Sequence, residues 1–391
     1  MNFARRTNWE LRRNLLSEVL QEHRASGREL FDLTASNPPD AGLAYDTPTI
    51  LSAFDNPQVL QYHPEPNGLE SSRRAVCDYY GEVAERTDSG QSVDPERLLL
   101  TTSTSEAYTY AFRLLCDPGD EVLIPTPSYP LFEYLAGLQD VRLVPYPLFY
   151  DHGWHIDLHS MRQAISERTR AIIVVNPNNP TGSYAKANER AELNALCAER
   201  NLALVVDEVF LDYSLTDPQP SFAFNRDALT FTLSGVSKIS GLPQMKLAWM
   251  AVSGPEAMVG GALTRLEVIA DTYLSMSAPV QLAAPVLLQQ RASMQDQLGR
   301  RLKCNLSELD RQLGRGMVSR LTVEGGWYVV LRVPRIRSDE ELAVALLTKE
   351  NVLVQPGYFY DFQSEGYLVI SLITPEQVLR EGLQRTLRYL G

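Results

Sequence analysis

The 391-residue sequence contains few of the residues that build metal centres and disulfide frameworks. Four cysteines lie far apart along the chain: Cys77, Cys116, Cys197 and Cys304. Zinc sites and redox motifs use closely spaced ligands, so these thiols are predicted to be reduced and packed, as in a cytosolic protein. The histidines at positions 152, 155 and 159 are close together, but no second group of ligands supports them. We therefore expect no metal site.

Long apolar runs and concentrated positive charge are also missing. No uninterrupted apolar run is long enough to cross a bilayer, and the first residues lack the apolar core of a secretory signal. The formal net charge is −12, without a clustered run of lysine and arginine, so we expect neither a membrane nor a nucleic-acid partner. Glu10, Glu18 and Glu22 argue against a transit peptide. The sequence predicts a cytoplasmic protein that handles small molecules.

From about residue 97 onward, short apolar runs alternate with helical patterns. Near-continuous apolar runs are typical of strands buried on both faces of a mainly parallel sheet flanked by helices. We predict seven such strands, at residues 97–100, 121–124, 142–145, 171–175, 202–206, 229–233 and 247–252. Ligands of such sheets bind beyond the carboxyl ends of the strands. The residues that follow each strand are therefore the first candidates for a site.

The chain is long enough to form two domains. We expect a large domain at residues 45–280 and a smaller α+β domain that combines residues 1–44 with residues 281–391. The smaller domain is predicted to start with one long helix at 281–313 and to contain a strand at 326–333. We expect it to close over the large domain by a hinge motion.

One lysine stands directly after a predicted strand, between small residues. Lys238 lies in the sequence SGVSKISGLP, which follows the strand at 229–233. A free lysine has a pKa of roughly 10.4, so only about one amine in a few thousand is neutral at pH 7. An enzyme that uses this amine as a nucleophile must lower its pKa or hold it as an imine. A surface lysine is the simpler alternative, and the residues upstream argue against it.

Four other predicted strands are followed by suitable polar or aromatic side chains. Ser103 and Thr104 open a helix, where small hydroxyl residues and free backbone N–H groups suit a phosphate. Tyr129 lies in a proline-stiffened turn, from which its ring can stack on a flat heterocycle. Asn179 lies in the turn NPNNPTG, whose prolines and glycine fix the direction of its amide. Asp207 ends a buried strand, and its carboxylate needs a cationic partner such as a protonated pyridine nitrogen.

Two stiff loops nearer the N-terminus offer further candidates. Asn37 precedes two prolines, which hold it in an extended conformation. Tyr62 begins the rigid loop YHPEPNG, and such loops often carry functional side chains on a firm scaffold. An ordinary turn asparagine and a packing tyrosine are the alternatives at these two positions.

Taken together, these motifs resemble those of the fold-type I pyridoxal-phosphate enzymes, specifically the class I and II aminotransferases typified by aspartate aminotransferase. The resemblance covers essentially the whole chain. It implies an α/β fold whose large domain holds the seven-stranded sheet, and pyridoxal 5′-phosphate as cofactor. It also implies an aminotransferase that moves an amino group between an amino donor and a 2-oxo acid acceptor.

The resemblance assigns a role to each candidate residue. Lys238 is implied to form the internal aldimine and then to act as the acid and base that moves a proton. The other candidates are implied to bind the cofactor: Asp207 at the ring nitrogen, Asn179 at the ring oxygen, Tyr129 on the ring face, Ser103, Thr104 and Lys246 at the phosphate, and Tyr62 at the phosphate of a neighbouring subunit. The role of Tyr62 implies a homodimer. Asn37 is the candidate substrate contact.

The sequence departs from the family pattern at four positions. Phe210 stands where a tyrosine is common, which removes one hydrogen bond worth roughly 1 kcal/mol, and Tyr213 lies at a different place in the turn. Gly235 replaces a hydroxyl residue, and Lys246 replaces an arginine, which exchanges a bidentate fork for a point charge. Val369 stands where the family carries the arginine that grips the substrate α-carboxylate. Such a contact contributes roughly 1.5 to 3 kcal/mol.

Val369 leaves open how a substrate carboxylate is held. Either Lys246 or an N-terminal arginine such as Arg12 supplies the cation, or the substrate lacks that carboxylate. The same fold also supports a β-lyase or decarboxylase acting on an amino acid, because only the cleaved bond differs. A cofactor-sensing module of a transcription regulator needs a DNA-binding domain, for which the short N-terminal segment offers no room. We therefore expect a cytosolic, homodimeric aminotransferase.

Overall fold

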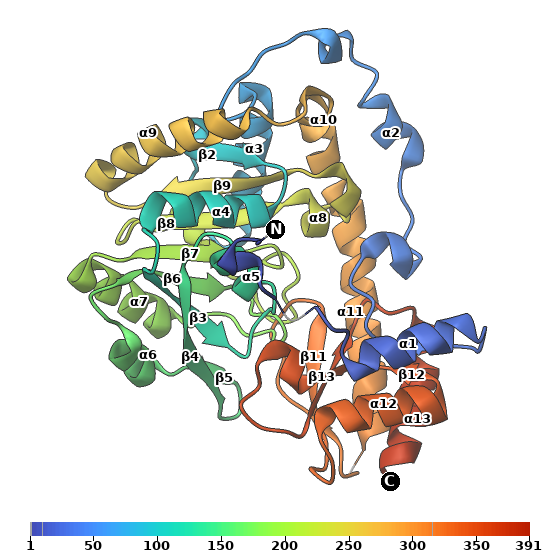
Figure 1. The fold of residues 1–391 in the computed structure, drawn as a ribbon. Helices are drawn as coiled ribbons and strands as arrows, with labels where there is room; N and C mark the ends of the chain where they lie inside the picture. The colour runs from blue at the N-terminus through green and yellow to red at the C-terminus, as the bar shows by residue number, and fades with distance from the viewer. Residues whose placement is uncertain (1, 10, 315) are drawn as a thin grey trace.

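A computed structural model describes residues 2–9, 11–314 and 316–391, so Glu10 lies outside the described residues. Within these ranges, the largest layer is a sheet with the strand order β2-β9-β8-β7-β6-β3-β4-β5 (Figure 1). Its strands are β2 (Leu98–Thr101), β3 (Glu121–Thr126), β4 (Arg142–Tyr150), β5 (Trp154–Ile156), β6 (Thr169–Val175), β7 (Ala203–Asp207), β8 (Thr230–Gly235) and β9 (Ala248–Ser253). All seven predicted strands are present, and β5 adds an eighth by pairing antiparallel with the end of β4.

The large sheet is mainly parallel, as the apolar runs predicted. Strands β4, β3, β6, β7 and β8 pair in parallel, while β9 runs antiparallel to both β8 and β2. Every residue of β3, β8 and β9 is buried, which explains their lack of an alternating pattern. Because the carboxyl ends of parallel strands meet at one edge, Thr126, Asp207 and Gly235 all lie at that edge.

Helices cover both faces of the large sheet (Figure 1). Side chains of α4 (Thr104–Leu115), α5 (Phe132–Gly137) and α9 (Glu256–Tyr273) share an apolar core with one face. The opposite face packs against α3 (Glu70–Arg86), α6 (Leu158–Ala164), α7 (Ala187–Arg200) and α10 (Ala278–Gln289). The layers therefore leave the carboxyl edge of the sheet as the place where loops can carry side chains.

A smaller antiparallel sheet with the order β10-β11-β14-β13 lies beside the large one (Figure 1). It consists of β10 (Ser319–Arg320), β11 (Tyr328–Arg332), β14 (Tyr367–Ser371) and β13 (Gln355–Pro356), with α12 (Asp339–Glu350) and α13 (Glu376–Leu390). The N-terminal segment joins this part, since β1 (Phe31–Asp32) pairs with β12 (Val352–Leu353) and Leu16 of α1 (Leu15–Ala25) enters the same core. This shared core agrees with the predicted smaller domain, whose boundaries stay a prediction.

The predicted long helix at 281–313 consists of two helices, α10 and α11 (Arg291–Leu313), which meet at Gln290. Short elements complete the chain: α8 (Val236–Ile239) and the 3₁₀ helices η1 (Arg5–Thr7), η2 (Pro38–Ala41), η4 (Pro95–Arg97), η5 (Phe222–Phe224), η6 (Pro243–Met245) and η7 (Gly357–Tyr360). None of the helices in the described ranges combines the length and apolar character that a membrane span requires.

Residues 46–68 form an arm that runs outside the two sheets (Figure 1). The arm contains α2 (Thr47–Ser52) and η3 (Pro57–Leu60). Three of its large apolar side chains are exposed, with exposed fractions of 63% for Leu51, 89% for Leu60 and 79% for Tyr62. Such a row of exposed apolar side chains is unusual for the surface of a monomer.

Candidate active site

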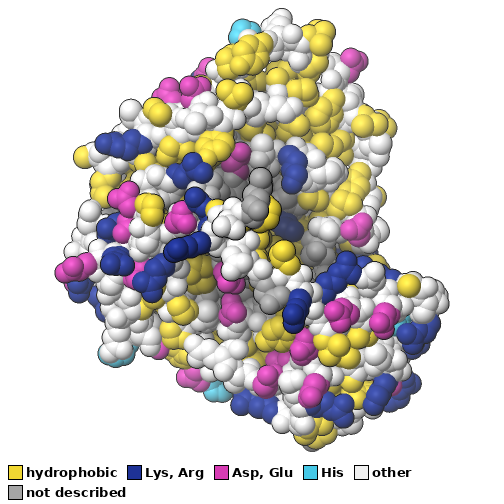
Figure 2. All heavy atoms as spheres, viewed as in Figure 1, with side chains coloured by type: hydrophobic (Ala, Val, Ile, Leu, Met, Phe, Trp, Pro, Cys, Tyr) yellow, Lys and Arg dark blue, Asp and Glu magenta, His cyan; other side chains and the backbone are white. Residues whose placement is uncertain are grey.

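A cavity of about 380 Å³ lies at the carboxyl edge of the large sheet. Asp207 and Lys238 line it from the large-sheet part, while Tyr328 and Gln355 line it from the small sheet. On the face shown in Figure 2, the surface is hollowed between these two parts of the molecule. The cavity therefore forms where the sequence analysis placed the site, between two parts that are far apart in the sequence.

Lys238 is held in the cavity by its backbone and by the close packing of its strand. Strand β8 ends at Gly235 and α8 begins at the next residue. A Cβ atom at Gly235 would lie 2.9 Å from the carbonyl oxygen of Leu247, the residue before the antiparallel neighbour β9, which accounts for glycine where a hydroxyl residue is common. The hydroxyl of Tyr213 donates a hydrogen bond of 2.6 Å to the carbonyl oxygen of Lys238. Tyr213 thus fixes the lysine backbone.

The amine of Lys238 sits in an aromatic and largely dehydrated environment. Its Nζ donates to the carbonyl oxygen of Ser36 at 3.2 Å and lies 5.0 Å and 5.7 Å from the ring centroids of Trp327 and Phe210. Burial lowers the pKa of Lys238 to about 8, against the opposing attraction of Asp207. A larger fraction of the amine is therefore neutral at physiological pH than in a free lysine.

Asp207 ends β7 and places a carboxylate deep in the same cavity. The hydroxyl of Tyr108 donates to its Oδ2 at 3.2 Å, and the backbone N–H of Val209 donates to its Oδ1 at 3.1 Å. Burial raises the pKa of Asp207 to about 6, although these two hydrogen bonds and the charge of Lys238 act in the opposite direction. Both donors are neutral, so a cationic ring nitrogen would fit beside this carboxylate.

The N-terminus of α4 opens into the cavity near Asp207. Ser103 is the N-cap residue, and its Oγ accepts a hydrogen bond of 3.2 Å from the backbone N–H of Glu106. Thr104 and Ser105, in the first turn, line the cavity. The free N–H groups and the positive end of the helix dipole favour an anion here. This arrangement suits a phosphate group.

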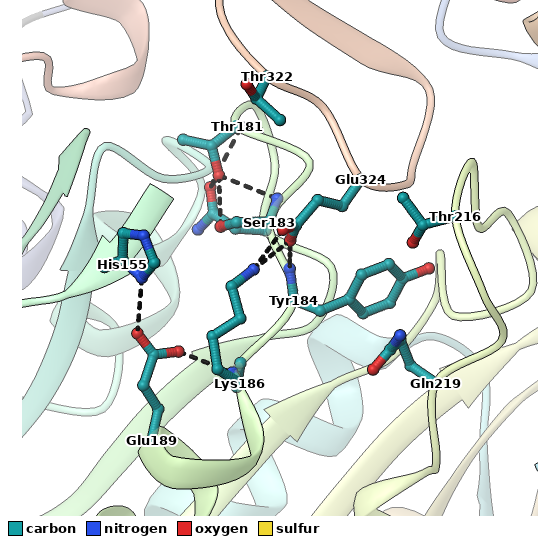
Figure 3. Close-up of polar contacts among 12 residues, drawn as sticks. His155, Thr181, Ser183, Tyr184, Lys186, Glu189, Thr216, Gln219, Thr322 and Glu324 are labelled. Carbon is teal, nitrogen blue, oxygen red and sulfur yellow. Dashed lines mark hydrogen bonds and ion pairs between the residues drawn. The ribbon is translucent and has the colours of Figure 1, made fainter. Parts of the chain in front are cut away.

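The turn that carries Asn179 is followed by residues that form a polar network (Figure 3). The Thr181 hydroxyl donates to Asn178 Oδ1 at 2.9 Å and shares a 2.9 Å hydrogen bond with the Ser183 hydroxyl. Glu324, in the loop before β11, accepts from the backbone N–H of Tyr184 at 2.9 Å and forms an ion pair with Lys186. The network joins the turn to the small-sheet part. Asn179 itself lines the cavity, and its buried Oδ1 has no partner among the described residues.

The structure brings together six of the predicted site residues and leaves three apart. The six that line the cavity are Asn37, Thr104, Tyr129, Asn179, Asp207 and Lys238. Of the described residues, Ser103, Lys246 and Tyr62 are not part of the lining: Ser103 caps α4 beside Thr104, Lys246 is exposed after η6, and Tyr62 is exposed on the arm. The roles that the sequence analysis gave to these residues stay predictions.

Several cavity residues were not predicted from the sequence. Tyr108 lies one helical turn after Thr104 on α4, so helical spacing from the predicted phosphate site points to it. Ser36 precedes Asn37 and contributes a backbone carbonyl, which no sequence pattern reveals. Gln355 and Tyr360 come from β13 and η7. Their position depends on the pairing of distant strands in the small sheet.

The substituted family positions have distinct surroundings. Phe210 is buried against Trp327 and Tyr328 and lines the cavity without a hydroxyl. Tyr213 does not replace it, because its hydroxyl is engaged by the carbonyl oxygen of Lys238. Val369 is fully buried in the small sheet, opposite Gln355 and Val330. The lining of the cavity therefore contains no cation at position 369.

Comparisons with known proteins agree with this fold. The family model of aminotransferase class I and II matches residues 28–385. Alanine aminotransferase of Mycobacterium tuberculosis is 28% identical over 94% of this chain and 86% of its own length. Glutamate-pyruvate aminotransferase AlaA of Haemophilus influenzae is 26% identical over 93% of this chain and 91% of its own length. The structure of alanine aminotransferase from Pyrococcus furiosus superposes with a TM-score of 0.86 at 22% identity, covering 100% of this chain and 99% of that one.

This chain therefore has the fold of the aminotransferases of known structure. It belongs to the class I and II aminotransferases, and it is a pyridoxal-phosphate-dependent transaminase. The predicted family, α/β fold and cofactor are confirmed, and the β-lyase or decarboxylase alternative is not favoured.

The residues present fit pyridoxal phosphate. Asp207 offers a buried carboxylate with neutral donors, Asn179 has a buried unpartnered oxygen, and Thr104 lies at an open helix N-terminus. When bound, this cofactor withdraws electrons from the carbon that carries the amino group.

Proposed function

We propose that this cavity is the site of transamination, with Lys238 as the residue that attaches the cofactor and transfers the proton. The single observation that supports this most is the half-buried amine of Lys238, which shares the cavity with the half-buried carboxylate of Asp207. A pKa of about 8 lets Lys238 both accept and return a proton near neutral pH. The Tyr213 hydrogen bond fixes the backbone from which this amine extends.

The surrounding residues divide the work of orientation. We propose that Asp207 holds a proton on the ring nitrogen, that Asn179 binds the ring oxygen and that Tyr129 covers the ring. Tyr108 supports this arrangement by its hydrogen bond to Asp207. Thr104 and the backbone N–H groups of α4 would hold the phosphate. Asn37, exposed at the mouth of the cavity, is proposed to contact the substrate.

We propose that two copies of the chain form the active unit. Tyr62 is 79% exposed on the arm that lies outside the two sheets, so it is available to a second subunit. Lys246 is also exposed, and both residues would complete the phosphate site in the dimer. The domain division at residues 44 and 280 and the hinge closure belong to the same proposal. All four cysteines are free, which supports the cytosol as the compartment.

Substitution of Lys238 tests the site assignment. Lys238→Ala is expected to abolish the visible absorbance of the covalently held cofactor after dialysis and to reduce amino transfer by several orders of magnitude. Lys238→Arg is the matched control, because it keeps the positive charge but cannot form an imine. We expect the same loss for both variants. Retention of the absorbance band by either variant would show that Lys238 is not the attachment site.

A half-reaction screen tests the reaction. The purified protein is loaded with pyridoxal phosphate and mixed with single amino acids and amines while the absorbance is recorded. Conversion of the cofactor to its aminated form, with release of an oxo product, is expected for at least one donor. Release of ammonia or carbon dioxide without this conversion would contradict transamination.

A further inference from the structure

The cavity has a second end, built by the small-sheet part, whose lining is neutral. Tyr328 of β11, Gln355 of β13 and Tyr360 of η7 form this end, while Asp207 and the start of α4 line the cavity from the large-sheet part. The backbone N–H of Ser128 donates to the carbonyl oxygen of Tyr360 at 2.9 Å, which ties this end to the large-sheet part. We call the set of Tyr328, Gln355 and Tyr360 the neutral end.

Charge is scarce throughout the cavity. Considering only residues that the structure describes, two charged side chains line it, Asp207 and Lys238. The proposed function engages both with the cofactor. Neither Lys246 nor Arg12 contributes to the described lining. A carboxylate at the neutral end would thus lose its hydration without gaining a cation from this part of the chain, and it would share a small cavity with the carboxylate of Asp207.

The groups at the neutral end are suited to an uncharged partner. The hydroxyl of Tyr360 donates to Oε1 of Gln355, which leaves the amide nitrogen of Gln355 as the donor toward a ligand. Burial raises the pKa of both Tyr360 and Tyr328 well above the usual value of tyrosine, so both phenols stay neutral. An amide nitrogen and neutral phenols bind a carbonyl or amide group without any charge to balance.

The position of Val369 supports the same conclusion. In the small sheet, Val369 lies directly opposite Gln355 on one side and Val330 on the other, and it is fully buried. Directly opposed residues of neighbouring strands point to the same face of a sheet. On the face where Gln355 lines the cavity, the opposed positions of β14 and β11 are therefore occupied by Val369 and Val330. Among the described residues, none of these three opposed positions carries a cation.

We infer that this transaminase acts on amino compounds that carry no free carboxylate on the carbon bearing the amine, such as α-amino amides or simple amines. The inference rests on the proposed function of Lys238. Leu131, Leu135 and Phe359 also line the cavity, so an apolar substituent fits beside this carbon. In the half-reaction, the donor carbon is oxidised by two electrons and the aldehyde of the cofactor is reduced to an amine. The donor gives up its amino group together with the proton and the electron pair of one C–H bond. The aldehyde oxygen leaves as water, and another water supplies the oxygen of the product, an oxo amide or ketone.

Three donors of matched shape test the inference on the holoenzyme: alanine, alaninamide and isopropylamine. They differ only in whether a carboxylate, an amide or a methyl group stands beside the amine. Alaninamide is expected to convert the cofactor with a kcat/KM at least roughly ten-fold above that of alanine, because a buried carboxylate without a cation forfeits a ten- to hundred-fold contribution. Isopropylamine has neither group: conversion of isopropylamine would show that the enzyme needs no carboxyl group, whereas conversion of alaninamide alone would show that it recognises the amide. A preference for alanine would overturn the inference.

Substitution of Gln355 gives a second, independent measurement. Gln355→Arg places a cation at the neutral end and is expected to shift the ratio of alanine to alaninamide by roughly ten-fold toward alanine. Gln355→Met is the matched control, since it removes the amide without adding charge, and its ratio is expected to stay on the side of alaninamide. If Gln355→Arg left the ratio unchanged, the neutral end would not be the place that selects against the carboxylate.

Failure of the inference is distinct from failure of the proposed function. Binding of 2-methylalanine and its amide, which lack the transferable proton, is measured by calorimetry on the same holoenzyme. The amide is expected to bind at least roughly ten-fold more tightly, by the same lost contribution. Equal or tighter binding of the acid would overturn the inference even if no donor reacts. Absence of conversion with every donor, together with tighter binding of the amide, would contradict transamination alone.

Discussion

Replacing Asp207 with asparagine is expected to remove a pH-dependent penalty on the stability of the cofactor-free protein. Burial raises the pKa of this carboxyl group from 3.8 to about 6. At about 1.4 kcal/mol per pKa unit, a shift of this size corresponds to roughly 3 kcal/mol of unfolding free energy. Asparagine has nearly the same shape and does not titrate. The variant should therefore lose this pH-dependent part of the unfolding free energy, while the asparagine still offers an acceptor to the hydroxyl of Tyr108.

The direction of the effect follows from proton binding. Because the folded-state pKa is raised, the folded protein binds more protons than the unfolded chain between about pH 4 and pH 6. The stabilisation is fully present below the unfolded pKa and is lost as the pH rises through the folded pKa. The unfolding free energy of Asp207→Asn, relative to the wild type, should thus increase by up to roughly 3 kcal/mol from about pH 4 to about pH 7.5.

Urea unfolding over a pH series measures this difference at equal protein concentration. Two other buried carboxyl groups have raised pKa values, Glu208 at about 7 and Asp339 at about 6. Both are present in the wild type and in the variant, so their contributions cancel in the difference. Glu208→Gln is a matched control, whose difference should extend to higher pH. A constant difference between Asp207→Asn and the wild type across the series would refute the assignment of the raised pKa to Asp207.

Two further substitutions test how the lysine is surrounded. Tyr213→Phe removes the hydroxyl that donates to the carbonyl oxygen of Lys238. Leaving this buried acceptor unpaired should cost about 1 to 3 kcal/mol of unfolding free energy, which is measured as a lower thermal midpoint. An unchanged midpoint would contradict the role of Tyr213. Phe210→Tyr places a phenol where Phe210 lines the cavity. One added hydrogen bond worth roughly 1 kcal/mol is expected to tighten binding of pyridoxal phosphate about five-fold. Unchanged or weaker affinity in a fluorescence titration would show that the hydroxyl finds no partner there.

The large sheet and one end of the site could be predicted because both depend on local patterns. Apolar runs located the parallel strands, and parallel strands share one carboxyl edge. Residues directly after those strands, such as Thr104, Asn179 and Lys238, therefore meet in one cavity. The arrangement is a consequence of chain direction. For this reason, the predicted positions hold even though the strand ends differ by one to several residues.

The small-sheet end of the cavity could not be predicted in the same way. Gln355 and Tyr360 reach the cavity because β13 pairs with β14, and β14 pairs with β11 across a long stretch of sequence. A register shift of one residue would turn these side chains to the other face. No local pattern specifies that register. The break at Gln290 between α10 and α11 was missed for a related reason, because the apolar pattern continues through it.

Val369, where the family resemblance implies an arginine, is best understood together with its neighbours. An isolated loss of the arginine would leave space at the cavity face and partners without a counter-charge. Instead, Val369 is fully buried between Val330 and Gln355. The hydroxyl of Tyr360 donates a hydrogen bond to Gln355, and both of these residues line the cavity. Packing and hydrogen bonding are thus both satisfied without a cation. Within the part of the chain that the structure describes, this end of the cavity is lined by neutral groups, so the lack of a cation is a property of the whole wall and not of position 369 alone.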